Sequence, residues 1–285
     1  MTSRIRHLPW LFAAATVAIQ IPYPLLDGDA RQAVTIASVG TFCAATLTHI
    51  GTTRGPIRAA VFGIAIGVLA FAIEVLGVHT HVPFGHYAYD GGLGPSLAGV
   101  PLLIGLAWTM MAAPALYAAR RIADRTIPGT ASNVRRAATV GIVALALAGW
   151  DLFLDPQMVA DGYWHWFSES AALQGIPWTN LLGWLVAGTL IGAVADAVLP
   201  PAEAPTAPRD ALPLALFAWT YVGSILVNAA FLDRPGIALD GGIGMGLVAV
   251  PLLWALAVPR VTPVAPPPSA GRATDSAAAQ LSAAR

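Results

Sequence analysis

Two aspartates stand near the end of a hydrophobic segment, which is an unusual place for carboxyl groups. Asp151 and Asp155 are four residues apart in the stretch WDLFLDP, so on a helix both carboxyl groups lie on one face. Pro156 disfavours helical geometry at Asp155, which predicts that the helix ends here. Two like charges on a last turn repel each other and oppose the helix dipole, and both effects favour a protonated carboxyl. A carboxyl that is protonated at neutral pH is a general acid.

Glu74 ends another hydrophobic segment. An ionisable side chain inside a membrane segment is costly without a partner, which makes it a functional candidate. Asp196 has a similar position just before Pro200, and we expect a structural role for it. A structural interpretation is also open for the aspartates, with one capping a loop and the other bonding a tryptophan indole. The sequence predicts three catalytic residues: Glu74, Asp151 and Asp155.

Residues 74–99 and 150–184 contain no Arg or Lys but are rich in aromatic side chains. Tryptophan and tyrosine prefer the membrane interface, so an interfacial belt is one interpretation. The Gly- and Pro-rich turns favour another, because irregular backbone at membrane depth needs burial or a cavity to line. Aromatic ring faces also stabilise cations. We therefore predict a pocket whose substrate-binding residues are Phe84, Tyr87, Tyr89, Trp150, Trp164, Trp166, Asn180 and Trp184.

The histidines of these segments are expected to give polar support: His79, His81, His86 and His165. Their spacing lacks the HxxxH and HxxHH boxes of membrane di-iron enzymes. A mononuclear metal site built from the first three and an acid stays open as an alternative. His49, alone in a hydrophobic segment, is expected to be a core residue. We expect no metal and no other cofactor, since the chain has neither a GxGxxG fingerprint nor a P-loop.

The composition is that of a membrane protein. Of the 285 residues, 56% are hydrophobic and 11% are charged, and the mean hydropathy is +0.68. Soluble domains carry roughly 25% charged residues. The net charge is zero, which argues against nucleic acid as a partner. We predict an all-α, polytopic integral membrane bundle of about eight transmembrane helices, or about seven if one lies in the interface.

Stretches free of acidic and basic residues locate the expected spans. They are His7–Leu26, Gln32–Thr53, Ala59–Ile73, Gly91–Ala119, Ala137–Trp150, Ser170–Ala195, Ala211–Leu232 and Gly241–Pro259. With a cytoplasmic N-terminus, 13 of the 15 arginines fall inside, and only Arg31 and Arg234 fall outside. The positive-inside rule expects this bias. We therefore expect a multi-pass protein of the cell membrane with its N-terminus in the cytoplasm.

The chain divides into a transmembrane domain, residues 1–260, and a C-terminal tail, residues 261–285. The tail is rich in Pro, Ala and Ser without apolar periodicity, which predicts disorder. The first hydrophobic segment could be a signal peptide. Its length and the prolines Pro22 and Pro24 favour a retained anchor instead.

Several long motifs of one protein family occur in this chain, in the same order and between the corresponding hydrophobic segments. They are Glu74 with the following VPFGHYAY (Val82–Tyr89), LGPSLAGVPLLIGLAWTMM (Leu93–Met111), WDLFLDPQMVADGYWHW (Trp150–Trp166) and GIPWTNLLGW (Gly175–Trp184). Through them the chain resembles the CruF-type carotenoid biosynthesis family of integral membrane hydratases, over roughly residues 60–200.

The resemblance implies hydration of the terminal isopropylidene double bond of an acyclic carotenoid to a tertiary alcohol. The substrate end would be of the lycopene type or the C50 bisanhydrobacterioruberin type that precedes bacterioruberin. The residue chemistry agrees: such a hydration needs an acid, a base and a lining that stabilises a carbocation. Expected partners are the carotenoid, membrane lipid and other enzymes of the carotenoid pathway.

Two other function classes compete with a hydratase. A prenyltransferase-like carotenoid elongase would hold diphosphate through magnesium at Asp-rich helix ends. The acidic segments contain no Arg or Lys to assist, which argues against it. A non-catalytic lipid or carotenoid transporter has broken helices with midplane charges as its signature, and no inverted repeat is detectable here.

Overall fold

The computed structural model describes residues 3–167, 172–201 and 210–258. The described residues up to Ala255 form one compact unit. The predicted tail, residues 261–285, lies outside the described residues. The long helices are α1 (Ser3–Gln20), α2 (Gly28–Arg54), α3 (Pro56–Thr80), α4 (Leu103–Thr126), α5 (Ser132–Ala160), α6 (Trp178–Val198), α7 (Ala211–Ala230) and α8 (Pro235–Ala257), with a short 3₁₀ helix η1 (Tyr23–Leu25).

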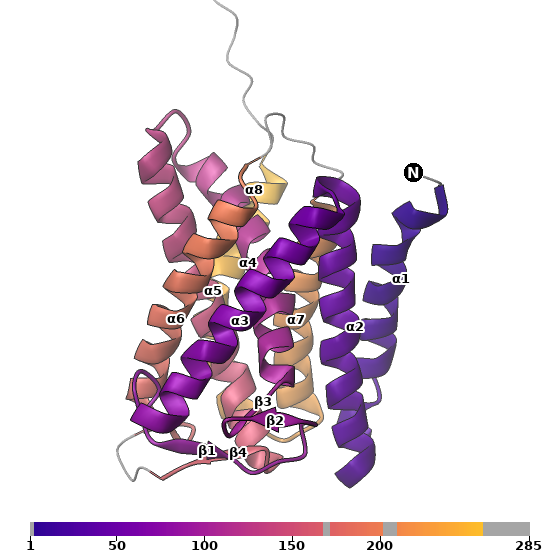
Figure 1. Ribbon diagram of the computed structural model, residues 1–285, viewed down its shortest axis with the longest axis vertical. Coiled ribbons are helices and arrows are strands. Elements are labelled where there is room, and N and C mark those ends of the chain that lie inside the picture. The colour runs from indigo at the N-terminus through magenta and orange to yellow at the C-terminus, as the bar shows by residue number, and fades with distance from the viewer. Residues whose placement is uncertain (1–2, 168–171, 202–209, 259–285) are drawn as a thin grey trace, which may run out of the picture. The chain divides into compact units, whose positions relative to one another are not determined.

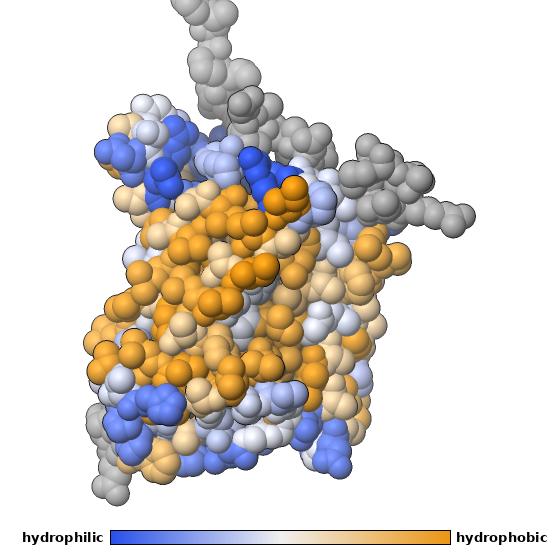
Figure 2. Space-filling model, viewed as in Figure 1, coloured by the Kyte–Doolittle hydropathy of each residue, from blue (hydrophilic) through white to orange (hydrophobic). Residues whose placement is uncertain are grey.

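These helices confirm the prediction of a polytopic helical membrane protein. Seven of those described are long and apolar enough to cross a membrane. The eighth, α4, carries Arg120, Arg121, Asp124 and Arg125 in its last turns, and it packs against α2, α3, α5, α6 and α7. A helix surrounded by other helices does not need an apolar face toward lipid. Figure 2 shows the hydrophobic band over α3 and its neighbours, between hydrophilic ends.

Two predicted spans begin too early. The segment from Gly91 to Leu102 is a turn and a hairpin of β2 (Ser96–Leu97) and β3 (Val100–Pro101), so α4 starts only at Leu103. Likewise a hairpin of β5 (Ala172–Leu173) and β6 (Ile176–Pro177) precedes α6. Glycines with positive φ in these turns make the backbone double back, which a hydropathy count does not detect.

The prediction that the helix ends at Asp155 is wrong. Helix α5 continues through Pro156 to Ala160. Proline removes one backbone hydrogen bond, and the following turn buries Met158, which offsets that loss. Asp151 and Asp155 consequently lie inside the helix, so the helix-dipole argument applies to them only weakly.

One short sheet joins the two aromatic segments. Strand β1 (Tyr87–Tyr89) pairs antiparallel with β4 (Trp164–Trp166), with Tyr87 opposite Trp166 and Tyr89 opposite Trp164. Side chains alternate along a strand, so these four aromatic residues share one face. Figure 1 shows the strands at one end of the helices and the α2–α3 and α4–α5 connections at the other.

Buried ion pairs hold both ends of the helices. Asp196 accepts hydrogen bonds from Arg120 (2.6 Å) and Arg136 (2.8 Å), which joins α4, α5 and α6 and supports the structural role expected for it. At the end of the helices that carries strands β1 and β4, the 4%-exposed side chain of Asp161 binds Arg31 and Arg234. The two arginines that depart from the charge bias therefore share one buried partner. The compartment that each end faces stays a prediction.

Candidate active site

Glu74 lies on α3, 5% exposed, and accepts three hydrogen bonds from neutral donors. The donors are the hydroxyls of Tyr87 (2.5 Å) and Tyr89 (3.0 Å) and the indole nitrogen of Trp108 (3.1 Å). Three donors satisfy most of the lone pairs of one carboxylate without a cation.

The two tyrosines stay protonated. Burial, followed by the nearby charge of Glu74, raises the pKa of Tyr87 and of Tyr89. A phenol whose pKa is raised remains a hydrogen-bond donor and is a poor acid at neutral pH. Strand β1 therefore supplies fixed donors to Glu74 but no exchangeable proton.

Trp108 reaches Glu74 because α3 and α4 pack backbone to backbone. A Cβ added at Gly105 would lie 2.9 Å from the carbonyl oxygen of Gly67, so only glycine allows this approach. Trp108 also stacks on Trp184 with ring centroids 4.1 Å apart. Sequence reasoning did not select Trp108, although it lies within the motif Leu93–Met111.

Asp151 and Asp155 form a buried carboxyl pair, 1% and 4% exposed. The amide nitrogen of Asn180 on α6 donates to Asp151 (2.9 Å) and to Asp155. The shared amide holds the two carboxyl groups side by side, where two like charges repel and a proton on one of them is favoured. Trp164 lines the same cavity as Asp155.

A cavity of about 30 Å³ separates Glu74 from the aspartate pair. All eight predicted substrate-binding residues line it, together with Glu74, Asp155, Trp108 and three apolar residues of α4 and α5. A space of this volume holds a water molecule. Asp151 does not line it. Its carboxyl lies beside a separate space of about 10 Å³ under the β5–β6 hairpin, and its Oδ1 atom has no hydrogen-bond partner.

The histidines lie apart from this cavity. His81 and His86 stack on each other with ring centroids 3.9 Å apart, and His165 bonds Asp90 at 2.8 Å. His79 is exposed at the end of α3. Within the described ranges, no three His, Cys, Asp or Glu side chains are placed to share a metal ion. Polar support from these residues is thus confined to the surface of the strand end.

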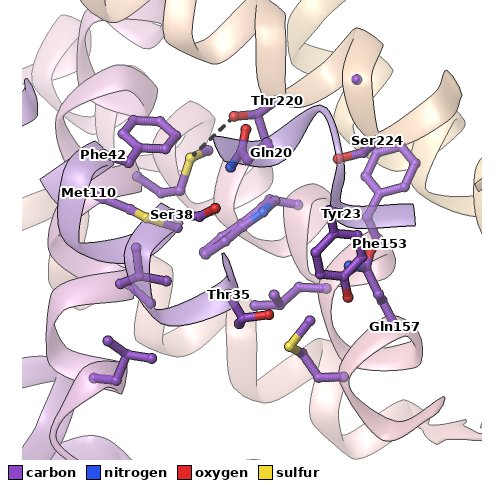
Figure 3. A pocket seen from close by; sticks show the side chains of 18 of the residues that line it. Gln20, Tyr23, Thr35, Ser38, Phe42, Met110, Phe153, Gln157, Thr220 and Ser224 are labelled. Carbon is purple, nitrogen blue, oxygen red and sulfur yellow. Dashed lines mark hydrogen bonds between the residues drawn. The ribbon is translucent and has the colours of Figure 1, made fainter. Parts of the chain in front are cut away.

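A second, larger cavity of about 220 Å³ adjoins the first. It lies between α1, α2, α4, α5 and α7, and Figure 3 shows part of its lining. Five side chains contribute to the lining of both cavities: Ile104, Ala107, Trp150, Leu154 and Trp164. An apolar chain lying in the larger cavity would therefore direct its end toward Glu74 and Asp155.

Comparisons with known proteins place the chain in a family. Residues 32–251 match the family described as carotenoid biosynthesis protein. The chain belongs to this family. A curated relative, the bisanhydrobacterioruberin hydratase of Haloarcula japonica, is 33% identical over 134 residues. The match covers 47% of this chain and 43% of that relative, so the chain spans less than half of the relative's length. No solved structure matches the chain.

Family membership confirms the recognition made from the motifs. The matched region includes the whole of the acid cluster and its aromatic lining. The protein is thus a multi-pass membrane protein of carotenoid biosynthesis, and Glu74, Asp151 and Asp155 are buried within it.

Proposed function

We propose that the protein is a carotenoid hydratase that adds water to the terminal isopropylidene double bond of an acyclic carotenoid. The observation that carries this proposal is a water-sized cavity between two buried acids, Glu74 and Asp155, inside an aromatic wall. The cavity adjoins a larger space for an apolar chain. The Haloarcula japonica relative is named as a hydratase, which supports the same reaction.

Hydration begins with transfer of a proton from Asp155 to the less substituted alkene carbon. A C–H bond forms, the π bond breaks, and a tertiary cation is left on the neighbouring carbon. The indoles of Trp150, Trp164 and Trp184 line the cavity and stabilise the cation. We assign the donation to Asp155 because, of the two aspartates, it is the one that lines the cavity.

Water then attacks the cation and gives its proton to Glu74, which leaves the tertiary alcohol. We assign the base to Glu74, because it lines the same cavity as Asp155 and its oxygens accept hydrogen bonds from three neutral donors. One proton has left Asp155 and one has reached Glu74, so the cycle closes when a proton returns through the cavity. The reaction consumes only alkene and water.

Asp151 receives a different role from the one expected. Asp151 does not line the cavity, so it orients Asp155, which carries the transferred proton, instead of touching the alkene. We propose Asp151 as a positioning residue and Asp155 as the proton donor.

The substrate end is of the lycopene type or of the C50 bisanhydrobacterioruberin type. An elongase is less well supported, because the hydrogen-bond donors to Glu74 and the aspartate pair are neutral and offer diphosphate no cation. We also propose that the protein lies in the cell membrane with its N-terminus in the cytoplasm.

Expression in a host that makes acyclic carotenoids tests the proposal. We expect pigments whose mass has increased by one or two water molecules, and no such product with Asp155→Asn at equal membrane abundance. An elongated pigment would replace the proposal with a transferase. Unchanged pigment from the wild-type protein, on both substrate types, would leave a transporter.

A further inference from the structure

The larger cavity has a polar side that a simple hydrocarbon would not need. Six polar residues from four helices line it among apolar ones: Gln20, Thr35, Ser38, Gln157, Thr220 and Ser224. Figure 3 shows them on opposite walls of the same space. Polar groups facing an apolar medium cost free energy unless they are hydrogen-bonded.

Several of these groups are already satisfied by the protein. Thr35 donates to the carbonyl of Arg31 (2.9 Å), and Thr220 donates to the carbonyl of Leu216 (3.0 Å). The side-chain oxygen of Gln20 accepts a hydrogen bond from the indole nitrogen of Trp219 at 2.7 Å. These contacts stabilise helices and leave little capacity for a ligand.

Ser38 differs from them. The residue lines the cavity and is only 8% exposed, and its hydroxyl has no hydrogen-bond partner among the described residues. A serine within a helix commonly bonds the carbonyl four residues earlier. Here that bond is not made, although two threonines of the same helix, Thr35 and Thr48, make it.

We infer that Ser38 is a specificity-determining residue that hydrogen-bonds an oxygen carried by the substrate chain close to its reacting end. This inference rests on the proposed function. A hydroxyl on the chain would satisfy Ser38, whereas a pure hydrocarbon would leave it unpaired. A site built to bond a substrate hydroxyl discriminates against the analogue that lacks it.

The volume of the larger cavity limits where on the substrate chain that oxygen can lie. A volume of about 220 Å³ is below the range of about 300–1,000 Å³ that encloses a drug-sized ligand. The cavity therefore holds only the end of a long polyene, and the remainder lies in lipid. Because the cavity shares Trp150 and Trp164 with the acid site, the oxygen and the reacting alkene belong to the same chain end.

The test compares two acyclic carotenoids with the same reacting alkene, one with a hydroxyl near that end and one without. We measure kcat/KM for each with the full-length protein in lipid vesicles. The wild-type protein should prefer the hydroxylated substrate. Ser38→Ala should reduce that preference about twofold to tenfold, the effect of one hydrogen bond, by slowing only the hydroxylated substrate.

Thr48→Ala is the matched control, since it removes a hydroxyl of the same helix that is bonded to its own backbone and lies outside the cavity. It should leave the preference unchanged. If Ser38→Ala fails to accumulate, Ser38→Cys keeps the volume and weakens the hydrogen bond.

Equal slowing of both substrates, or no change in the ratio, would overturn the role of Ser38 and indicate that water or the helix satisfies its hydroxyl. In that case the proposed hydratase function would still stand. If the wild-type protein hydrates neither substrate, the proposed function fails and this inference fails with it.

Discussion

Replacing Asp155 by asparagine removes a proton donor while nearly keeping the shape of the site. The amide oxygen can still accept the hydrogen bond from Asn180, which holds the carboxyl now. It has no acidic proton to give to an alkene carbon. We expect hydration to fall by about 10²–10⁴-fold, which corresponds to about 2.7–5.5 kcal/mol of activation free energy.

The upper part of that range is expected because the cavity holds no substitute donor. The pKa values of Tyr87 and Tyr89 are raised, so neither phenol protonates carbon at neutral pH. Glu74 is held as a base by three donors. The folded protein should not lose stability, since one of two crowded buried acids becomes neutral.

The assay is conversion of an acyclic carotenoid to its hydrated product, measured chromatographically at matched membrane abundance. Asp151→Asn is the companion variant. Because Asp151 acts only by orienting Asp155 through their shared partner Asn180, its loss should cost about tenfold to a hundredfold, the effect of one hydrogen bond to a charged group. Near-normal conversion by the Asp155 variant, or a larger loss from the Asp151 variant, would refute the assignment and restore Asp151 as the donor.

Four further outcomes are expected. Glu74→Gln should also reduce hydration by about 10²–10⁴-fold, with substrate still bound, as measured by single-turnover kinetics. Gly183→Ala should destabilise the protein by about 1–3 kcal/mol in thermal unfolding, because the added Cβ would stand 2.6 Å from the Phe84 ring; unchanged stability would contradict that packing. Asp196→Asn should cost about 3 kcal/mol by leaving a buried arginine unpaired, and should spare kcat in the protein that folds. A topology reporter inserted near Asp161 should read the non-cytoplasmic side, and a cytoplasmic signal there would reverse the predicted orientation.

Much of the architecture followed from local sequence. Hydrophobic runs long enough to cross a bilayer predicted the helices, because lipid requires apolar side chains whatever the packing. The isolated acids were conspicuous for the same reason. The eight predicted pocket residues line one cavity because strands β1 and β4 join the two aromatic segments.

The ends of the helices were predicted less well. The hairpins before α4 and α6 are as apolar as the helices they precede, so hydropathy merged them. The passage of α5 through Pro156 depended on burial of the following turn, which is a tertiary effect.

Sequence alone specified which residue types gather at the acid cluster, because burying a carboxyl or an indole in lipid restricts where either can occur. Only the tertiary structure distinguished Asp155 from Asp151, brought Trp108 to Glu74 and left Ser38 without a partner. Residues four apart lie on one helix face in any sequence reading. Which of them meets a cavity depends on the rotation of each helix against its neighbours, and contacts between segments distant in the chain set that rotation.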